Sequence, residues 1–172
     1  MIVLFTDFGL AGPYVGQLHA LLAQQAPGVA VIDLFHDVPS HDVRAAAYLL
    51  PAYAQGFPPA TVFVGVVDPG VGSERSAIVL NADHRWYVGP DNGLFEIVAR
   101  RARGCEWREI LWRPARLSAS FHGRDLFAPV AAMLARGVVP ESRPVTPVSP
   151  AAWPDDLAQV VYVDRFGNLL TG

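Results

Sequence analysis

Cysteine is almost absent from this sequence of 172 residues, which contains only Cys105. A single cysteine excludes a disulfide within the chain, and it excludes any zinc site that needs several thiolates. We therefore expect Cys105 to be a packed residue, and we expect the protein to work in a reducing, cytoplasmic setting.

Charged residues are scarce as well, at 17% of the chain, and they sum to a formal charge of -3 with a pI near 5.9. No run of basic residues offsets this acidity, so the sequence argues against nucleic acid as a partner. No basic leader opens the chain, and no apolar stretch approaches the ~20 residues that span a bilayer. The sequence thus predicts neither export by an obvious signal nor a place in the membrane.

Two common nucleotide-binding motifs are also missing. Neither the phosphate-binding pattern GxxxxGK[ST] nor the dinucleotide fingerprint GxGxxG occurs. The nearest approach is Gly9, Gly12 and Gly16, whose spacing is wrong. We interpret these glycines as a permissive turn between a strand and a helix.

The sequence does contain a regular alternation of strand and helix patterns, and 52% of its residues are hydrophobic. The size fits one main domain with a sizeable core. Strands are expected at 2–6, 29–34, 61–67, 76–82, 85–89 and 108–112, and helices at 14–25, 42–55, 91–103 and 123–136. Pro51 should kink or shorten the second helix. The order predicts an α/β fold with a mixed, mostly parallel sheet sandwiched between helices.

The last third of the chain changes character. Residues 137–158 contain five prolines, too many for a helix or an inner strand, so they predict a linker. Residues 159–172 then indicate a strand and a turn with nothing after them to pair with or bury them. We expect an amino-terminal α/β domain over 1–150, and over 151–172 a linker and the first strand of a truncated, small β-rich carboxyl-terminal domain.

Acidic residues follow two of the expected strands, where α/β proteins bind their ligands. Asp7 is suited to accept hydrogen bonds from the two hydroxyls of a ribose, although capping the next helix explains it equally well. Asp68 and Arg75 share the loop DPGVGSER and should form an ion pair, catalytic or merely structural. His122 precedes a helix and is a candidate general base, although an isolated histidine is more often structural.

Other polar residues favour plainer interpretations. The cluster His36, Asp37, His41 and Asp42 contains metal-ligand types, but a loop with an aspartate that caps the next helix explains it better. His19 and His84 are expected to be structural or solvent-exposed. In GPDNG, Asp91 or Asn92 is expected to be the N-cap of the third helix, residues 91–103.

Taken together, the motifs resemble those of the S-adenosyl-L-methionine (SAM) hydroxide adenosyltransferases, which are homologues of the SAM-dependent fluorinases and chlorinases. The matching segments are TDFG with PYVG, HDVPSHDVRAA, VVDPGVGSER, GPDNGLF, FHGRDLFAP and VDRFGN, in the family's order and approximate spacing. The resemblance runs from residue 2 to residue 172. Each motif alone is weakly specific, and their common order makes a chance match improbable.

The resemblance implies hydrolysis of SAM to adenosine and L-methionine, with water attacking C5′ of the ribose and with neither metal nor cofactor. By motif, Asp68, Arg75 and His122 surround the attacking water. We expect His122 to accept its proton while Asp68, a weaker base when paired with Arg75, orients the water. Asp7 should bind the ribose diol, and Asp164 and Asn168 the amino and carboxylate groups of methionine. Family members form trimers that bind SAM between neighbouring subunits.

Three alternatives remain open at this point. A halide-using relative is disfavoured because the Asp68 carboxylate would repel the halide. A non-catalytic SAM- or adenosine-binding protein would keep the fold without turnover, which the set Asp68, Arg75 and His122 argues against. A metal-dependent phosphohydrolase would have to use the cluster between His36 and Asp42, and it would hold bound metal.

Overall fold

A computed structural model describes residues 1–147 and 153–172, in which a seven-stranded sheet has the strand order β2-β1-β3-β5-β4-β6-β7. The elements of the sheet layer are β1 (Ile2–Thr6), β2 (Val31–Phe35), β3 (Val62–Val66), β4 (Ala77–Ala82), β5 (Arg85–Pro90), β6 (Cys105–Ile110) and β7 (Ser142–Pro144). The helices are α1 (Tyr14–Gln25), α2 (Val43–Ala54), α3 (Glu96–Arg101), the π-helix η1 (Gly123–Phe127) and α4 (Ala128–Ala135). A separate hairpin consists of β8 (Val160–Val163) and β9 (Leu169–Thr171).

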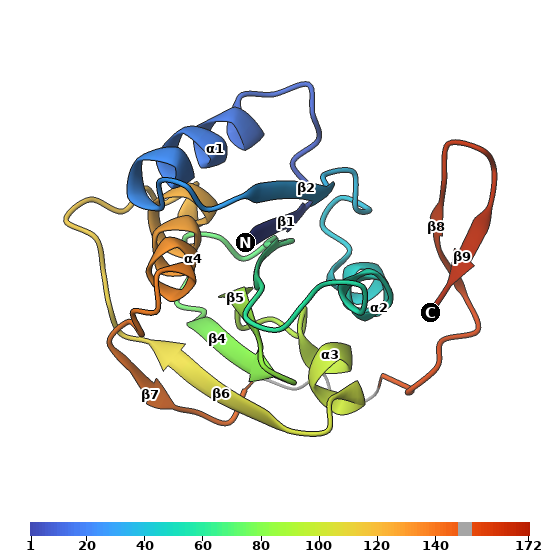
Figure 1. The fold of residues 1–172 in the computed structure, drawn as a ribbon. Coiled ribbons are helices and arrows are strands. Elements are labelled where there is room, and N and C mark those ends of the chain that lie inside the picture. Colours follow the sequence, from blue (N-terminus) through green and yellow to red (C-terminus); the bar gives the residue numbers. More distant parts are fainter. Residues whose placement is uncertain (148–152) are drawn as a thin grey trace.

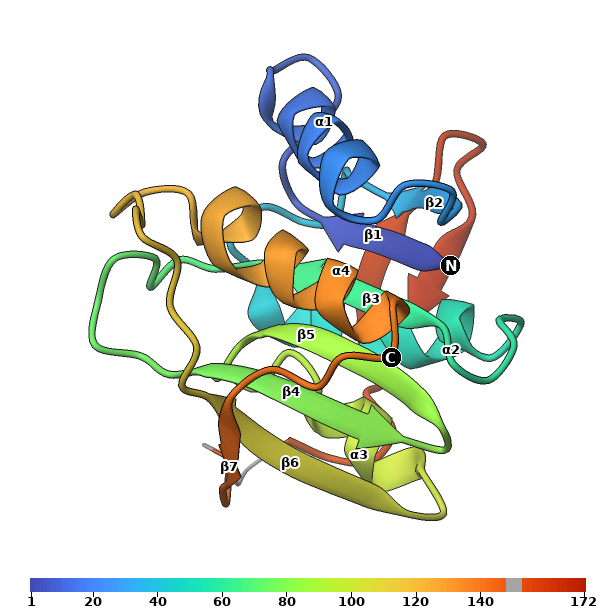
Figure 2. The same cartoon turned by 60° about the vertical axis from the view of Figure 1, so that its left-hand side comes forward.

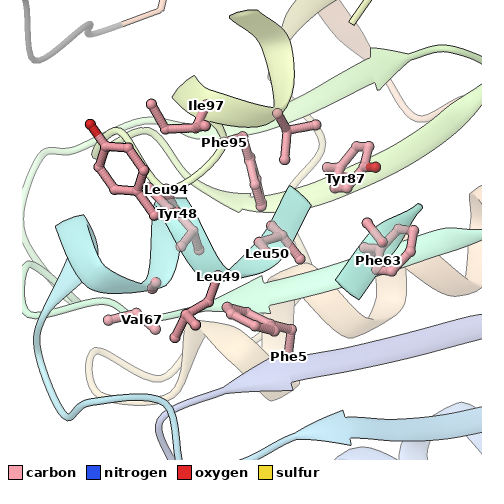
Figure 3. Close-up of a cluster of buried hydrophobic side chains, with 14 of the residues drawn as sticks. Phe5, Tyr48, Leu49, Leu50, Phe63, Val67, Tyr87, Leu94, Phe95 and Ile97 are labelled. Atoms are coloured by element: carbon pink, nitrogen blue, oxygen red, sulfur yellow. The ribbon is translucent and has the colours of Figure 1, made fainter. Parts of the chain in front are cut away.

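Helices cover both faces of the sheet, so the fold has three layers (Figures 1 and 2). Successive side chains of a strand point to opposite faces, and every residue of β1 and β3 is buried. Ile2 and Leu4 pack with α1 and α4, whereas Val3 and Phe5 pack with α2 and α3. Figure 3 shows the second of these clusters, where aromatic side chains from β1, β3 and β5 meet leucines from α2.

The order of the strands places a crevice at one edge of the sheet. The chain leaves β1 through α1 to β2, and it then returns through α2 to β3 on the other side of β1. Both pairings of β1 are parallel, so the carboxyl ends of β1, β2 and β3 lie together. Such a reversal of strand order opens a ligand crevice between the two central strands.

The expected sheet is confirmed as mixed. Three pairings, among β2, β1, β3 and β5, are parallel. The three that join β4, β5, β6 and β7 are antiparallel, including the β4–β5 hairpin. The prediction for 108–112 was misplaced, because β6 starts already at Cys105, where its pairing with β4 begins, and it ends at Ile110. Cys105 is exposed on this strand, so the prediction that it is packed was wrong.

One helix is shorter than predicted, and another continues past its proline. The third was expected over 91–103 but comprises only Glu96–Arg101, with Phe95 rather than Asp91 or Asn92 as its N-cap. Asn92 instead donates to the carbonyl of Val67, and Gly93 has a φ of 96°, outside the helical region. In α2, Pro51 lies inside the helix without ending it.

The carboxyl-terminal segments are more ordered than predicted. Within the expected linker, Ser142–Pro144 forms an edge strand on β6, a position that tolerates proline. Beyond it, β8 pairs with β9 rather than lacking a partner, and Val161 and Leu157 are buried in the core that includes α2. Figure 1 shows this hairpin beyond α2. The expected boundary between residues 150 and 151 lies in 148–152, outside the described residues.

No helix among the described residues has both the length and the apolar character needed to cross a membrane.

Candidate functional site

A cleft of about 250 Å³ lies at the carboxyl ends of β1 and β3, at the crevice that the strand order creates. Its lining is Asp7, Phe8, Tyr14, Ser40, His41, Val66, Asp68, Val71, Ser120, Phe121, His122 and Gly123. We call this the site cleft. It brings together three of the predicted site residues, Asp7, Asp68 and His122, from segments far apart in the sequence.

Arg75 joins two of these residues in one hydrogen-bonded chain. Its guanidinium forms a two-pronged ion pair with the Asp68 carboxylate, in which Nε donates to Oδ1 over 2.7 Å and Nη2 donates to Oδ2. Nη2 also lies 3.2 Å from Nδ1 of His122. Nη1 donates to the carbonyl of Ser76 over 3.1 Å, which fixes the plane of the guanidinium. The predicted set Asp68, Arg75 and His122 therefore is a single contact network.

The contact with Arg75 determines the protonation of the His122 ring. A guanidinium has only donors, so Nδ1 of His122 must accept, and the proton of the neutral ring is then on Nε2. His122 is 9% exposed, and this burial lowers its pKa, which the positive charge of Arg75 lowers further. The ring is consequently neutral at neutral pH and offers an Nε2–H donor.

Close packing of two loops brings Arg75 to His122. Gly72, in the loop after β3, has a φ of 79°, and a Cβ at this position would lie 2.4 Å from the carbonyl oxygen of Ala119. Only glycine permits both the conformation and the approach. The π-helix η1 begins directly after His122, and π-turns of this kind are frequent at functional sites.

Asp7 occupies the end of β1, as predicted. Its Oδ2 accepts a hydrogen bond of 2.9 Å from the backbone N–H of His41, which has a φ of 62°. A carboxylate has further lone pairs, so Asp7 can still accept from a ligand in the site cleft. Capping of α1 by Asp7 is not observed, because the N-cap residue of this helix is Pro13.

Aromatic side chains form a wall of the site cleft that the sequence analysis missed. The rings of Phe8, Tyr14 and Phe121 lie in mutual contact, with centroids 5.2 to 5.7 Å apart. A Cβ at residue 123 would lie 3.1 Å from the Phe8 ring, so Gly123 leaves room for this wall. These three residues belong to the segments TDFG, PYVG and FHGRDLFAP, in which only Asp7 and His122 were singled out as candidate site residues. Isolated aromatics are more often part of a core, and their pattern carried no separate signal.

Two predicted substrate-binding residues are not among the described residues that line the site cleft. Asp164 and Asn168 lie in the turn of the β8–β9 hairpin. There Asp164 accepts hydrogen bonds from the backbone N–H groups of Phe166 and Asn168 and from the Asn168 side chain. These bonds hold the pKa of Asp164 below its usual value. Asn168 is exposed and Asp164 is partly exposed, so both are accessible to another molecule.

The histidine and aspartate cluster after β2 is divided among different partners. Asp42 caps α2 by accepting from the N–H of Ala45, which confirms the interpretation as a capping loop. Asp37 accepts from the hydroxyl of Tyr162, and His41 contacts Ser40. The buried His36 bonds elsewhere, as described below. Across the described parts of the chain, no group of three or more such side chains is arranged to hold a metal ion.

Comparison with known proteins places these features in a family. The model of the SAM hydroxide adenosyltransferase N-terminal domain matches residues 2–143. An (R)-S-adenosyl-L-methionine hydrolase from Salinispora arenicola is 44% identical over 184 residues, covering 95% of this chain and 68% of the relative. The enzyme of the same name from Thermus thermophilus is 44% identical over 190 residues, covering 99% and 73%. A fluorinase from an Actinoplanes species is more distant, at 25% identity over 163 residues, covering 80% and 55%.

Solved structures agree with this placement. A conserved protein from Thermotoga maritima superposes with a TM-score of 0.91 at 38% identity, over 99% of this chain and 71% of that one. A conserved protein from Thermus thermophilus gives a TM-score of 0.76 at 39% identity, with the same two coverages.

Proposed function

Because the chain belongs to the SAM hydroxide adenosyltransferase family, we propose that it is a SAM hydrolase, which converts SAM and water into adenosine and L-methionine. The observation that carries this proposal is the network in which Arg75 joins Asp68 and His122, two residues that line the site cleft. SAM is the substrate, and the reaction needs no cofactor. The relatives with this enzyme name, at 34 to 44% identity, support the same reaction.

In this reaction the main task of the protein is to position a water molecule. Water attacks C5′ as the bond from C5′ to sulfur breaks, and the electron pair of that bond converts the sulfonium into a neutral thioether. This leaving group needs no general acid. The water must be held about 3 to 3.5 Å from C5′ and in line with the breaking bond. Asp68 and His122 both line the cleft and are suited to hold it.

The direction of the contact between Arg75 and His122 suggests how they divide this task. With Nδ1 accepting from Arg75, Nε2–H of His122 can donate to the water oxygen, while an Asp68 oxygen accepts one water proton. The second lone pair of the water is then available to C5′. This geometry favours His122 as a donor that orients the water, in place of the base expected from the sequence.

The proton has a simple route in this arrangement. As the bond between oxygen and C5′ forms, the water oxygen becomes positively charged and its protons become strongly acidic. A weakly basic carboxylate then suffices as the acceptor, and Asp68 is in place. Arg75 holds that carboxylate through two parallel bonds and keeps it from rotating out of line.

Binding residues complete the proposal. Asp7 binds the ribose hydroxyls from the end of β1, and the hairpin residues Asp164 and Asn168 bind the methionine end in the cleft of a neighbouring subunit. The accessibility of the exposed Asn168 and the partly exposed Asp164 on the hairpin turn supports such a role in a homotrimer. The expected division into a domain of 1–150 and a β-rich segment of 151–172 belongs to the same proposal, as does a reducing, cytoplasmic setting.

Incubation with SAM in ¹⁸O-labelled water tests the proposed reaction. Adenosine and methionine should appear in equal amounts, with the label on the 5′-oxygen of adenosine, and EDTA should not slow turnover. S-adenosylhomocysteine as the product, unlabelled adenosine, or activity that EDTA removes and metal restores would each refute the proposal.

A further inference from the structure

A buried chain of polar side chains lies behind the site cleft. Thr6 is the last residue of β1, and its Oγ1 lies 2.8 Å from Nδ1 of His36, just after β2. Nε2 of His36 lies 3.0 Å from Oδ1 of Asp33. Thr6 is fully buried and His36 is 5% exposed, whereas Asp33 reaches the surface, where it also contacts His19 of α1. Buried polar groups of this kind are costly unless every bond is made.

The hydrogen bonds along this chain have a consistent direction. The backbone N–H of Phe8 donates to Oγ1 of Thr6 over 3.3 Å. The hydroxyl hydrogen of Thr6 is therefore available to donate a hydrogen bond to Nδ1 of His36. A neutral His36 then carries its proton on Nε2 and donates it to Asp33. Each donor in the chain has its acceptor, and the sequence of bonds ends at the partly solvated carboxylate.

This chain holds the turn that carries two site residues. Besides its side-chain bonds, His36 accepts a 2.6 Å hydrogen bond from the backbone N–H of Gly9 through its carbonyl. The turn from Thr6 to Gly9 is thus bonded to His36 at both ends, and between them lie Asp7 and Phe8, which line the site cleft. Thr6 and His36 are not among the described residues that line it.

We propose that Thr6 and His36 are positioning residues, which set Asp7 and Phe8 in the geometry that binds the substrate. The inference rests on the proposed function, because it assigns the binding of SAM to this turn. The competing explanation is that the chain only joins β1 to β2 and contributes to stability alone. The two explanations differ in what the loss of one hydroxyl does to substrate affinity.

Removal of the Thr6 hydroxyl separates them. Thr6→Val keeps the shape of the side chain and should raise KM for SAM about tenfold, the equivalent of one lost hydrogen bond, while kcat changes less than twofold. Thr6→Ser restores the hydroxyl and should restore KM. Thr61→Val is the matched control, since Thr61 is equally buried and donates to the Pro58 carbonyl at the far end of β3. It should lower stability and leave KM unchanged.

A second variant covers the case in which Thr6→Val does not fold. Asp33→Ala changes a partly exposed residue, leaves Nε2 of His36 without its acceptor, and should raise KM about threefold. Three results would each overturn the inference. KM could be equal in the wild type and both variants, it could rise in Thr61→Val as much as in Thr6→Val, or Thr6→Ser could fail to restore it. Calorimetry with the same proteins measures the dissociation constant of SAM and so tests the positioning independently of turnover. A wild-type protein that binds SAM and does not hydrolyse it refutes the proposed function alone.

Discussion

At the scale of single residues, the role of His122 depends on one hydrogen bond. The motif FHGRDLFAP indicated a reactive histidine, and no sequence pattern could show which ring nitrogen faces Arg75. That information comes from the packing of the loop after β3 against residue 119, where Gly72 permits close approach. The residue types of the site were thus predictable from the motifs, whereas the tautomer was not.

The proposed donor role of His122 leads to a distinct mutational pattern. His122→Ala should lower kcat about 100-fold or more, with little change in SAM affinity, the range for losing a group that handles the attacking water. His122→Gln can place an amide N–H near the position of Nε2–H. Its kcat should therefore be at least tenfold higher than that of His122→Ala. Steady-state kinetics of the two variants checks this.

The pH dependence provides the control for this prediction. Burial and Arg75 lower the pKa of His122 below the ordinary histidine value of about 6.5. The ring should therefore stay neutral down to about pH 6.5 and become protonated only in more acidic solution. Protonation breaks the acceptor at Nδ1, so kcat should be flat from pH 8 to about 6.5 and decline in more acidic solution. If His122→Gln were as slow as His122→Ala, the donor role would be refuted and His122 would instead act as the base.

Asp68 should determine which nucleophile enters the site. By itself, a carboxylate ~4 Å from a halide costs about 4 kcal/mol at an effective dielectric near 20, which corresponds to roughly a thousandfold less halide entry. We therefore expect no 5′-halogenated nucleoside from the wild type in molar chloride or fluoride. Asp68→Asn leaves the Arg75 guanidinium without its carboxylate and should slow hydrolysis at least 100-fold. It should also make SAM binding sensitive to chloride.

Mass spectrometry of the nucleoside products and calorimetry at two chloride concentrations make this measurement. Arg101→Gln, far from the cleft at the end of α3, serves as the control for a general effect of charge. A halogenated product from the unmodified protein would place it in another branch of the family.

At the scale of elements, alternation of apolar residues was sufficient to locate most strands and helices, while local side-chain bonds decided where they begin. The helix expected from residue 91 starts at Glu96, because Asn92 bonds to the carbonyl of Val67, just after β3. The helix expected over 123–136 has nearly that extent, but its first turn is a π-helix. Propensities do not distinguish a π-turn from an α-turn, so this feature of the site was beyond sequence reasoning.

The π-helix supplies an anchor for the loop that carries His122. Asp125 accepts a 2.9 Å hydrogen bond from the backbone N–H of Ser118, and it pairs with Arg124. Asp125→Ala should lower the free energy of unfolding by about 1 kcal/mol and should lower kcat, because the loop of residues 118–122 loses its tie. Urea unfolding and kinetics at pH 7 test both effects, and Asp156→Ala, whose side chain is 97% exposed, should change neither.

Acid titration adds a second measurement for Asp125. The hydrogen bond from Arg124, more than any other contact, holds the pKa of Asp125 below its usual value of 3.8. A depressed pKa contributes stability that is complete above the unfolded value and is lost as the pH falls through the folded value. The difference in stability between the wild type and Asp125→Ala should therefore persist from pH 7 to about 4 and shrink below it. A constant difference throughout would contradict the assignment of the stabilising bond.

At the scale of the whole molecule, the cleft and the hairpin are two separate parts of one proposed site. A ligand site at the carboxyl ends of the strands could be predicted from the alternation of strands and helices. The position of the hairpin against α2 could not. It depends on contacts between residues far apart in the sequence, such as the hydrogen bonds from Tyr162 to Asp37 and from Tyr48 to the carbonyl of Pro154.

If the hairpin serves the cleft of a neighbouring subunit, two inactive variants should restore each other. Asp68→Ala disables the cleft and leaves the hairpin intact, whereas Asp164→Ala with Asn168→Ala disables the hairpin and leaves the cleft intact. Each protein alone should hydrolyse SAM at least 100-fold more slowly than the wild type. After joint unfolding and refolding in equal amounts, roughly a quarter of all sites in the randomly assembled trimers combine an intact cleft with an intact hairpin. Activity should therefore rise to roughly a quarter of the wild-type value.

Size-exclusion chromatography with light scattering establishes whether the mixed proteins are trimers. Mixing without refolding is the control, because intact assemblies of one variant contain no functional pair of parts and should stay inactive. A cleft that uses the hairpin of its own chain would give a different result, since every chain in the mixture then carries one disabled part. Recovery no greater than the sum of the two separate activities would therefore show that the subunits do not share their sites, and it would require Asp164 and Asn168 to act within one chain or not at all.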